Sequence, residues 1–358
     1  MGNMLSVKPA RPGWLLLASV LVLAVAGCRP PSAAQPAPPA AEAGATTAPA
    51  DAARADPLPS WRTGANKQAI IDYVQAATTG GGPGFVPPEA RFAIFDNDGT
   101  LWAEQPIVQL EFVGTRIAAM AKEKPELAAN PAVKALLAKD TAFFQGKDGE
   151  KHAMQLLALS STGMSPDEYA REVEAFFATT RHPTLGVPYR QTTYQPMLEL
   201  LGYLRANGFE TWIGSGGGID FMRPISGPFY GIPPQQVIGS SGQYDVSLVD
   251  GKVAVLKAAR LGAVNDHEGK VAGVLAHAGK VPVFVAGNVR SGGDIAQLAY
   301  SQASPYPSFQ LLVNHDDGER EFAYGEADGA SLAAAKAGRW HVVSIRNDWE
   351  RVFPEPGP

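Results

Sequence analysis

The feature that most constrains the fold is a regular alternation of short apolar segments with amphipathic segments between residues 91 and 313. The apolar runs that predict buried strands cover residues 91–95, 209–214, 281–286 and 309–313. Helical patterns separate these runs, and such alternation favours a parallel sheet covered by helices. We therefore predict an α/β fold with a doubly wound, mostly parallel, Rossmann-like sheet. The active sites of such sheets lie beyond the carboxyl ends of their strands.

Local signals add helices, a hairpin and an insertion. The pattern predicts helices over residues 66–78, 194–206, 268–278 and 294–301, and the start of another over 219–224. Ser165-Pro166-Asp167-Glu168 is a capping box with proline at the first helical position, which predicts a helix to about residue 180. Asp250-Gly251 predicts a hairpin between residues 244–248 and 252–256. Residues 107–180 hold only helical signals, so we expect a helical domain (104–185) between core segments 61–103 and 186–358.

Composition narrows the class of partner. With 358 residues and 45% hydrophobic side chains, the chain can bury a core, and its net charge is −5. The sequence has no basic run of the kind that binds nucleic acid, so we expect no nucleic-acid partner. No pattern points to a protein partner. An anionic substrate would have to be held by local groups rather than by a positive field over the whole molecule.

The N-terminal residues predict export. Lys8 and Arg11 precede an apolar run over residues 14–26, a pattern typical of a secretory signal peptide over 1–27. The step Val25-Ala26-Gly27-Cys28 resembles a bacterial lipoprotein lipobox. This resemblance implies cleavage before Cys28, lipidation of its thiol, and anchoring to an envelope membrane on the periplasmic side. An ordinary signal peptide and an uncleaved anchor are the alternatives. Residues 28–60, rich in Pro and Ala, predict a disordered tether.

Two carboxylates follow the first apolar strand. Asp96 and Asp98 would stand at the carboxyl edge of the sheet, with Gly99 freeing the turn. Phosphoryl transfer to a carboxylate needs an ionised nucleophile and a nearby acid that protonates the leaving oxygen. A solvated surface turn is the alternative, but it explains neither the apolar residues 92–95 before the pair nor Leu101-Trp102 after it.

The segment Phe95-Asp96-Asn97-Asp98-Gly99-Thr100-Leu101 resembles the first motif of the haloacid dehalogenase superfamily, and specifically of its phosphatases. The resemblance covers residues 88–350 and is strongest to the phosphoserine phosphatase-like group, which has a helical cap after this motif. It implies that Asp96 is the nucleophile, that Asp98 is the general acid and base, that Mg²⁺ is the cofactor, and that residues 104–185 form the cap.

A second motif, residues 212–218, resembles the family strand that ends in a phosphate-binding serine or threonine. It implies that Ser215, Gly216 and Gly217 bind the phosphoryl group, because a hydroxyl and the free N–H groups of a Gly-rich turn can hold its oxygens. A flexible loop is the alternative. A dinucleotide fingerprint fails on spacing, since it would need glycine in place of Ile219.

The family also carries a lysine that balances charge between nucleophile and phosphate. Lys270 matches this third motif best, and Lys257 is its competitor. A lysine on a helix is ordinarily solvated, which is the alternative for both.

The fourth motif of the family completes the metal site. Here Asn288 and Asp294 are its candidates, and the resemblance implies Asp96, Asp98, Asn288 and Asp294 as metal ligands, with Asp294 either binding the ion or orienting Lys270. Two residues are inserted relative to the family pattern, and Gly292 stands where that pattern has an acid. The residues His315-Asp316-Asp317 invite a second metal site, but a polar strand end is the interpretation that we favour.

Together these motifs predict a magnesium-dependent phosphomonoester hydrolase that forms an aspartyl-phosphate. Its substrate would be a small phosphorylated metabolite, for example a phosphoserine-like one. The alternative from another class is a non-catalytic envelope binding protein on the same fold with a decayed metal site, which the altered fourth motif favours.

Overall fold

The computed structural model describes residues 56–145, 149–290 and 292–355. The predicted signal peptide, Cys28 and most of the predicted tether lie outside the described residues. The described part forms one compact unit, to which Leu58 and Ser60 already contribute buried side chains. The folded part therefore starts before residue 61, where the composition of the sequence changes.

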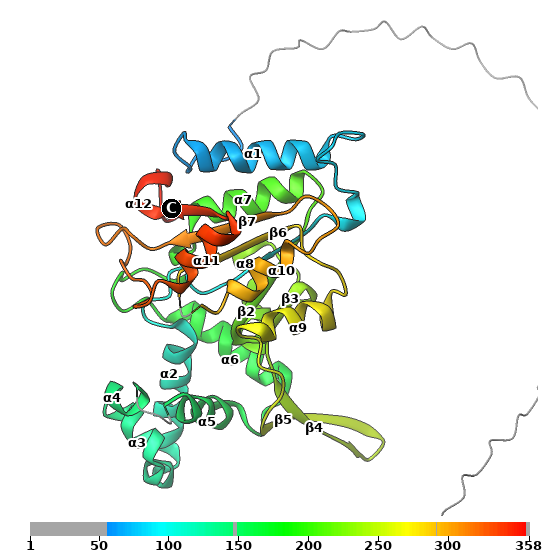
Figure 1. The fold of residues 1–358 in the computed structure, drawn as a ribbon. Coiled ribbons are helices and arrows are strands. Elements are labelled where there is room, and N and C mark those ends of the chain that lie inside the picture. Colours follow the sequence, from blue (N-terminus) through cyan, green and yellow to red (C-terminus); the bar gives the residue numbers. More distant parts are fainter. Residues whose placement is uncertain (1–55, 146–148, 291, 356–358) are drawn as a thin grey trace, which may run out of the picture. The chain divides into compact units, whose positions relative to one another are not determined.

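A six-stranded sheet forms the centre of this unit (Figure 1). Its strands, in spatial order, are β3 (Val237–Ser240), β2 (Glu210–Gly218), β1 (Phe92–Phe95), β6 (Phe284–Asn288), β7 (Phe309–Asn314) and β8 (His341–Ser344). Every neighbouring pair is parallel. The predicted α/β, doubly wound, parallel fold is confirmed.

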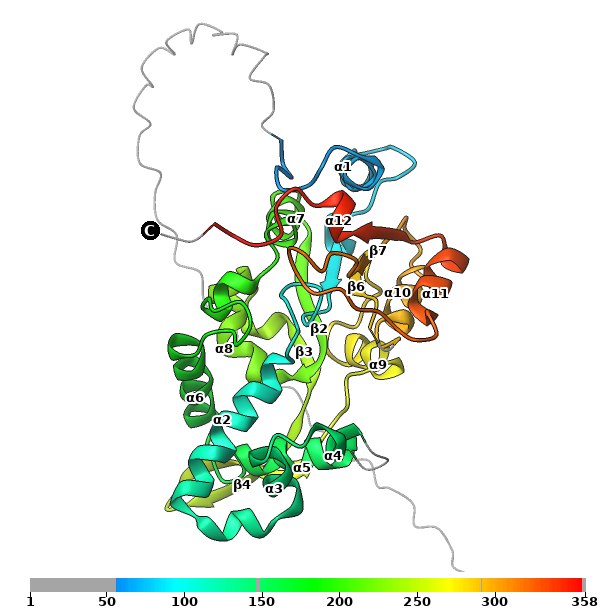
Figure 2. The ribbon, with the colours of Figure 1, turned by 90° about the vertical axis from the view of Figure 1, so that its left-hand side faces the viewer.

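The alternation of side chains along β1 explains how helices cover both faces of the sheet. Ala93 and Phe95 join one apolar cluster, whereas Phe92 and Ile94 join another. Successive side chains of a strand point to opposite faces, so four apolar residues in a row require a cover on each side. The first face carries α1 (Ala65–Thr78) and α7 (Gln195–Ala206). The second face carries α9 (Glu268–His277), α10 (Ile295–Ser301) and α11 (Ala330–Gly338), as Figure 2 shows.

The chain between β1 and β2 is helical, as the sequence predicts. It contains α2 (Val108–Glu123), α3 (Pro131–Leu137), α4 (Thr141–Gln145), α5 (Gly149–Ser161) and α6 (Pro166–Thr179), with short 3₁₀ turns. The predicted capping box is confirmed at α6. The Ser165 side chain accepts a hydrogen bond from the Glu168 N–H, and the Glu168 carboxylate accepts one from the Ser165 N–H. We refer to α2–α6 as the helical insertion.

A hairpin interrupts the second half of the sheet. After β2 the chain forms α8 (Ile219–Tyr230) and β3, then the antiparallel pair β4 (Gly242–Val249) and β5 (Lys252–Leu261). The predicted turn at Asp250-Gly251 is confirmed, because Val249 and Lys252 are paired across it. The hairpin packs against α5 and α6, so the helical insertion and the hairpin meet at the same end of the molecule (Figure 1).

Five elements differ from the sequence-based expectation. β2 continues to Gly218 instead of ending at residue 214, because its Gly-rich end pairs with β3 across an irregular register. Strands β3 and β8 have only four residues each, which is too short for a clear pattern, and they were not predicted. Helices α11 and α12 (Ile345–Asp348) were also missed. Within the described ranges, no helix combines the length and apolarity needed to cross a membrane.

Candidate active site

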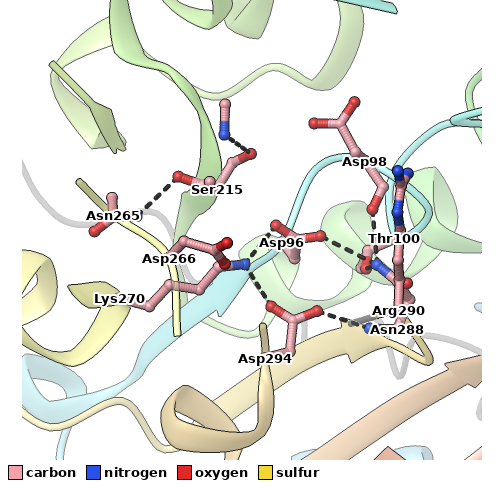
Figure 3. Close-up of polar contacts among 12 residues, drawn as sticks. Asp96, Asp98, Thr100, Ser215, Asn265, Asp266, Lys270, Asn288, Arg290 and Asp294 are labelled. Carbon is pink, nitrogen blue, oxygen red and sulfur yellow. Dashed lines mark hydrogen bonds and ion pairs between the residues drawn. The ribbon is translucent and has the colours of Figure 1, made fainter. Parts of the chain in front are cut away.

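The candidate residues converge where the strand order of the sheet reverses. β1 lies between β2 and β6, and from β1 the chain builds the sheet outward in both directions. Such a reversal opens a crevice at the carboxyl ends of the strands. Asp96 follows β1, Ser215 lies near the end of β2, and Asn288 ends β6. Figure 3 shows these side chains around one centre.

The centre contains a buried triad of charges. The Lys270 ammonium lies 2.7 Å from Asp96 Oδ1 and also contacts Asp294 Oδ1. Asp96 is 5% exposed and Lys270 is 3% exposed. Burial, and then the charge of Asp294, raise the pKa of Asp96, whereas Lys270 opposes this rise. Burial disfavours the charge on Lys270, but Asp294 and Asp96 together outweigh it and raise the pKa of the ammonium. The lysine therefore stays charged and compensates the carboxylates.

Asp98 points away from this triad and toward the insertion. Its Oδ1 accepts a hydrogen bond of 3.0 Å from Trp102 Nε1, and burial raises the pKa of its carboxyl. Gly99 follows with φ of +71°, a conformation that L residues rarely adopt. A Cβ on Gly99 would lie 2.7 Å from Glu104 Oε1 and 2.8 Å from Tyr324 Oη. The turn therefore requires glycine for both its conformation and its packing, and it sets the directions of the two aspartates.

The residues around Asn288 suit a hard cation. Asn288 Nδ2 lies 3.2 Å from Asp96 Oδ2 and 2.7 Å from the Asp98 carbonyl oxygen, while its Oδ1 is buried without a hydrogen-bond partner. The two ends of an amide are assigned from such contacts. With the amide turned over, three oxygens from Asp96, Asp98 and Asn288 would face one point, an arrangement that a cation between them would stabilise. Mg²⁺ prefers oxygen ligands and keeps several waters, so this donor set fits it.

This geometry refines the predicted ligands. Asp98 offers its backbone carbonyl to the cation position, because its carboxylate is directed to Trp102. Both carboxylate oxygens of Asp294 are engaged: Oδ1 contacts Lys270, and Oδ2 accepts the Asn288 N–H at 2.9 Å. Of the two expected roles of Asp294, the geometry favours the orientation of Lys270. Among the described residues, no group of three or more His, Cys, Asp or Glu side chains could hold a metal ion. The cation position described above is of a different kind, because two of its three oxygens come from the Asp98 carbonyl and the Asn288 amide.

Gly292 does not stand in the place of a missing ligand. Its N–H donates to Glu326 Oε1 at 2.5 Å, and a Cβ there would lie 3.3 Å from Ile295 Cδ1. Residues 290, 293 and 294 line the cavity of the site, whereas Gly292 does not. Position 292 therefore lies outside the lining of this cavity, and its N–H faces Glu326.

Ser215 and the glycines after it form the wall opposite Asp98. The Ser215 hydroxyl accepts the Gly217 N–H at 3.0 Å, and Asn265 Nδ2 donates to the Ser215 carbonyl at 2.9 Å. A Cβ on Gly217 would lie 3.3 Å from Ser215 Oγ and 3.6 Å from Asp98 Oδ2. The phosphate-binding candidates Ser215, Gly216 and Gly217 all line the same cavity as the two aspartates.

Other candidates lie apart from the site. Lys257, the competitor of Lys270, pairs with Asp220 and lies 4.6 Å from the centroid of the Tyr169 ring. The residues His315-Asp316-Asp317 have separate partners. Asp316 accepts a hydrogen bond from Ser344 Oγ at 2.6 Å, and Asp317 pairs with Arg320. They share no ligand position, in agreement with the strand-end interpretation.

The sequence did not reveal the polar groups that support the turn after Asp96. Arg290, from the longer fourth-motif loop, pairs with the buried Glu104. Burial raises the pKa of Glu104, and Arg290 opposes the rise. His315 Nε2 donates to the Gly99 carbonyl at 2.7 Å, and its Nδ1 lies 3.1 Å from Glu321 Oε2. Basic residues in a glycine-containing loop and a histidine at a strand end were visible, but nothing in the sequence assigned their partners.

The resulting cavity measures about 370 Å³ and has a mixed lining. Asp96, Asp98, Ser215, Lys270 and Asn288 form its floor. Apolar residues of the insertion, Leu110, Val113, Ala153 and Leu157, line the other side. Apolar groups beside charged ones lower the local dielectric constant, which strengthens the electrostatic interactions of the charged groups.

Comparison with solved structures finds the same fold at low sequence identity. A protein of unknown function from Anaerococcus prevotii is 15% identical, with a TM-score of 0.50, over 78% of this chain and 91% of that one. A protein of unknown function from Bordetella pertussis Tohama I is 19% identical, with a TM-score of 0.46, over 71% and 98%. A phosphoserine phosphohydrolase-like protein from Francisella tularensis is 16% identical, with a TM-score of 0.39, over 71% and 94%. No curated protein matches the sequence.

A family model gives the assignment. The model of the haloacid dehalogenase-like hydrolases matches residues 93–283, which is more than half of the chain and includes β1, the insertion, β2 and the segment that carries Lys270. The match covers the first three motifs, and the fourth, at Asn288 and Asp294, follows it and lines the same cavity at the carboxyl edge of the sheet. The chain belongs to the haloacid dehalogenase-like hydrolase family.

Proposed function

We propose that this hydrolase is a magnesium-dependent phosphomonoester phosphatase that forms an aspartyl-phosphate on Asp96. The observation that carries the proposal is that two aspartates, two residues apart, have different surroundings. Asp96 contacts Lys270 and faces the cation position, whereas Asp98, two residues later, faces the cavity from a less charged surrounding. A nucleophile has to be ionised and an acid has to hold a proton. Burial raises the pKa of both carboxyls, and the contact with Lys270, which Asp98 lacks, is what favours the ionised form of Asp96.

In the proposed reaction, an Asp96 carboxylate oxygen attacks phosphorus while the ester P–O bond breaks. Asp98 donates its proton to the leaving alkoxide, which departs as an alcohol. Asp98 then accepts a proton from the water that attacks the aspartyl-phosphate, which releases phosphate and restores Asp96. Bound Mg²⁺ would neutralise charge on the phosphoryl oxygens, held by Asp96, the Asp98 carbonyl and Asn288.

The other residues position the phosphoryl group. The Ser215 hydroxyl and the N–H groups of the glycine segment are donors for its oxygens, and Lys270 supplies a fixed positive charge beside Asp96. Donors that are already in place stabilise the transition state without reorganising. Asp294 holds Lys270 and the Asn288 backbone, so it acts by positioning. The helical insertion acts as the cap that shields the site.

We also propose that the enzyme works outside the cytoplasm, anchored by a lipid on Cys28 to a bacterial envelope membrane. The Val-Ala-Gly-Cys step after an apolar run supports this localisation. The Pro- and Ala-rich residues after it would let the folded unit stand away from the bilayer.

The decisive test is the hydrolysis of p-nitrophenyl phosphate by purified residues 53–358, with Mg²⁺ and with a chelator. We expect turnover that requires Mg²⁺ and that Asp96→Asn removes. Binding of phosphate esters without any turnover would instead favour a non-catalytic envelope binding protein on this fold.

A further inference from the structure

A second, larger cavity adjoins the active site. It measures about 600 Å³, and five residues line both cavities: Gln109, Leu157, Gly218, Ser240 and Leu261. Its walls come from α5, α6, the start of α8 and the β4–β5 hairpin. Clefts of about 300–1,000 Å³ are the size that buries drug-sized ligands. This space therefore greatly exceeds what a leaving group of the size of serine requires.

The proposed acid faces the passage between the two cavities. Asp98 Oδ2 lies 3.6 Å from the place of a Cβ on Gly217, and the next residue, Gly218, lines both cavities. Gln109 Oε1 accepts the Gly218 N–H at 2.8 Å, which ties the insertion to this edge. An alcohol that takes its proton from Asp98 would thus have its bulk at the entrance of the larger cavity.

The charged side chains of the larger cavity are paired with other side chains. Lys257 forms an ion pair with Asp220, and Tyr244 donates to Asp220 Oδ2 at 2.8 Å. Arg260 pairs with Asp245 at 2.6 Å. The Arg260–Asp245 pair is exposed, whereas the Lys257–Asp220 pair is largely buried, and separating buried charges is unfavourable. The ammonium of a zwitterionic leaving group would have to displace Lys257 from Asp220, the one acidic residue among the described residues that line this cavity.

Neutral groups make up most of the remaining wall. Hydrogen-bonding hydroxyls and amides come from Gln155, Ser161, Tyr169, Ser241 and Gln243. Apolar surface comes from Phe221 and from three alanines, Ala158, Ala258 and Ala259. Apolar walls with a few neutral polar groups are suited to an uncharged ring that bears hydroxyls.

We infer that this cavity holds the leaving group of the substrate, and that the leaving group is an uncharged polyhydroxylated alcohol of sugar or nucleoside size. The inference rests on the proposed phosphatase function. It names the substrate class as monophosphates of such alcohols and disfavours phosphoserine-like substrates, because their leaving group is zwitterionic. The β4–β5 hairpin and α5 then determine specificity, while the sheet edge performs the chemistry.

The test compares kcat/KM for four substrates: acetyl phosphate, a nucleoside 5′-monophosphate, a hexose 6-phosphate and phosphoserine. Acetyl phosphate needs only the catalytic floor, so its hydrolysis reports the proposed function by itself. Ala158→Trp and Ala259→Trp each fill the larger cavity from a different element. Ala337→Trp, at an exposed position of α11, is the matched control.

We expect the nucleotide or the sugar phosphate to exceed phosphoserine at least tenfold, and which of the two is better identifies the source of the alcohol. For the better of these two substrates, kcat/KM divided by kcat/KM for acetyl phosphate should fall at least tenfold in Ala158→Trp or Ala259→Trp. The same ratio should stay constant in Ala337→Trp. Hydrolysis of acetyl phosphate with a preference for phosphoserine, or with a ratio that neither cavity variant changes, would overturn the inference alone. Failure to hydrolyse any of the four would instead overturn the proposed function.

Discussion

Replacing His315 should destabilise the protein through the turn that follows Asp96. Its Nε2 donates to the Gly99 carbonyl at 2.7 Å, and its Nδ1 lies 3.1 Å from Glu321 Oε2. Both side chains are 0% exposed. The Glu321 carboxylate also accepts the Tyr194 hydroxyl at 2.6 Å. The His315 ring stacks on the Tyr324 ring, with 4.1 Å between their centroids. His315→Phe keeps an aromatic ring in this place but leaves Glu321 and the Gly99 carbonyl without their hydrogen-bond partner on residue 315.

His315→Phe leaves two buried groups each short of a hydrogen-bond partner, and each such group costs about 1–3 kcal/mol. For a protein of this size, such a loss lowers the Tm by on the order of 10 °C. Calorimetry and urea unfolding of residues 53–358 would measure it. A double-mutant cycle with Glu321→Gln, which keeps an acceptor for Tyr194, should show a coupling of about 1–3 kcal/mol. A loss below about 1 kcal/mol for His315→Phe, or additive losses in the cycle, would refute the proposed network.

The further predictions concern the acid, the metal and the anchor. Asp98→Asn should reduce the hydrolysis of alkyl phosphates far more than that of aryl phosphates, whose leaving group needs no proton, and equal losses would contradict the acid role. Burial raises the pKa of Asp98, so the stability that its protonated carboxyl contributes is present below the ordinary aspartate pKa and is lost as pH rises through the raised pKa. Asp98→Asn should therefore raise the Tm more at pH 8 than at pH 4. The opposite order would contradict the direction of the pKa shift. Asn288→Ala should raise the Mg²⁺ concentration for half-maximal activity by at least tenfold. Gly292→Asp should not lower this concentration, because residue 292 faces Glu326. Tighter Mg²⁺ binding in Gly292→Asp would mean that residue 292 lies at the metal site. Cys28→Ser should move the full-length protein out of the membrane fraction in cell fractionation, and an unchanged fraction would mean that the apolar segment itself is the anchor.

The sequence predicts those parts of the fold and site that depend on local patterns. Four apolar residues followed by two aspartates locate β1 and the candidate nucleophile, and parallel strands bring Ser215 and Asn288 to the same edge. Lys270 could be preferred over Lys257 by its position before β6, although only the three-dimensional contacts separate the two. Each of these features follows from a pattern of a few consecutive residues, either the period of the apolar residues or the polar residues at the end of a strand.

The remaining features depend on contacts between distant residues. His315 and Gly99 are 216 residues apart, and Arg290 and Glu104 are 186 apart, so no local pattern could join them. The orientation of residue 292 could not be predicted, because counting from a motif does not show how a longer loop turns. β3 and β8 were missed because their partners in the sheet, rather than their own four residues, stabilise them.

The most direct test of the central claim is to trap the phosphorylated enzyme. Residues 53–358 would be mixed with substrate and Mg²⁺, quenched with acid within milliseconds, digested, and analysed by mass spectrometry. The proposal predicts a phosphoryl group on Asp96 that forms and decays at rates compatible with turnover, and that is absent from Asp96→Asn. Steady turnover with no phosphoryl group on Asp96, or with the group on another residue, would contradict it.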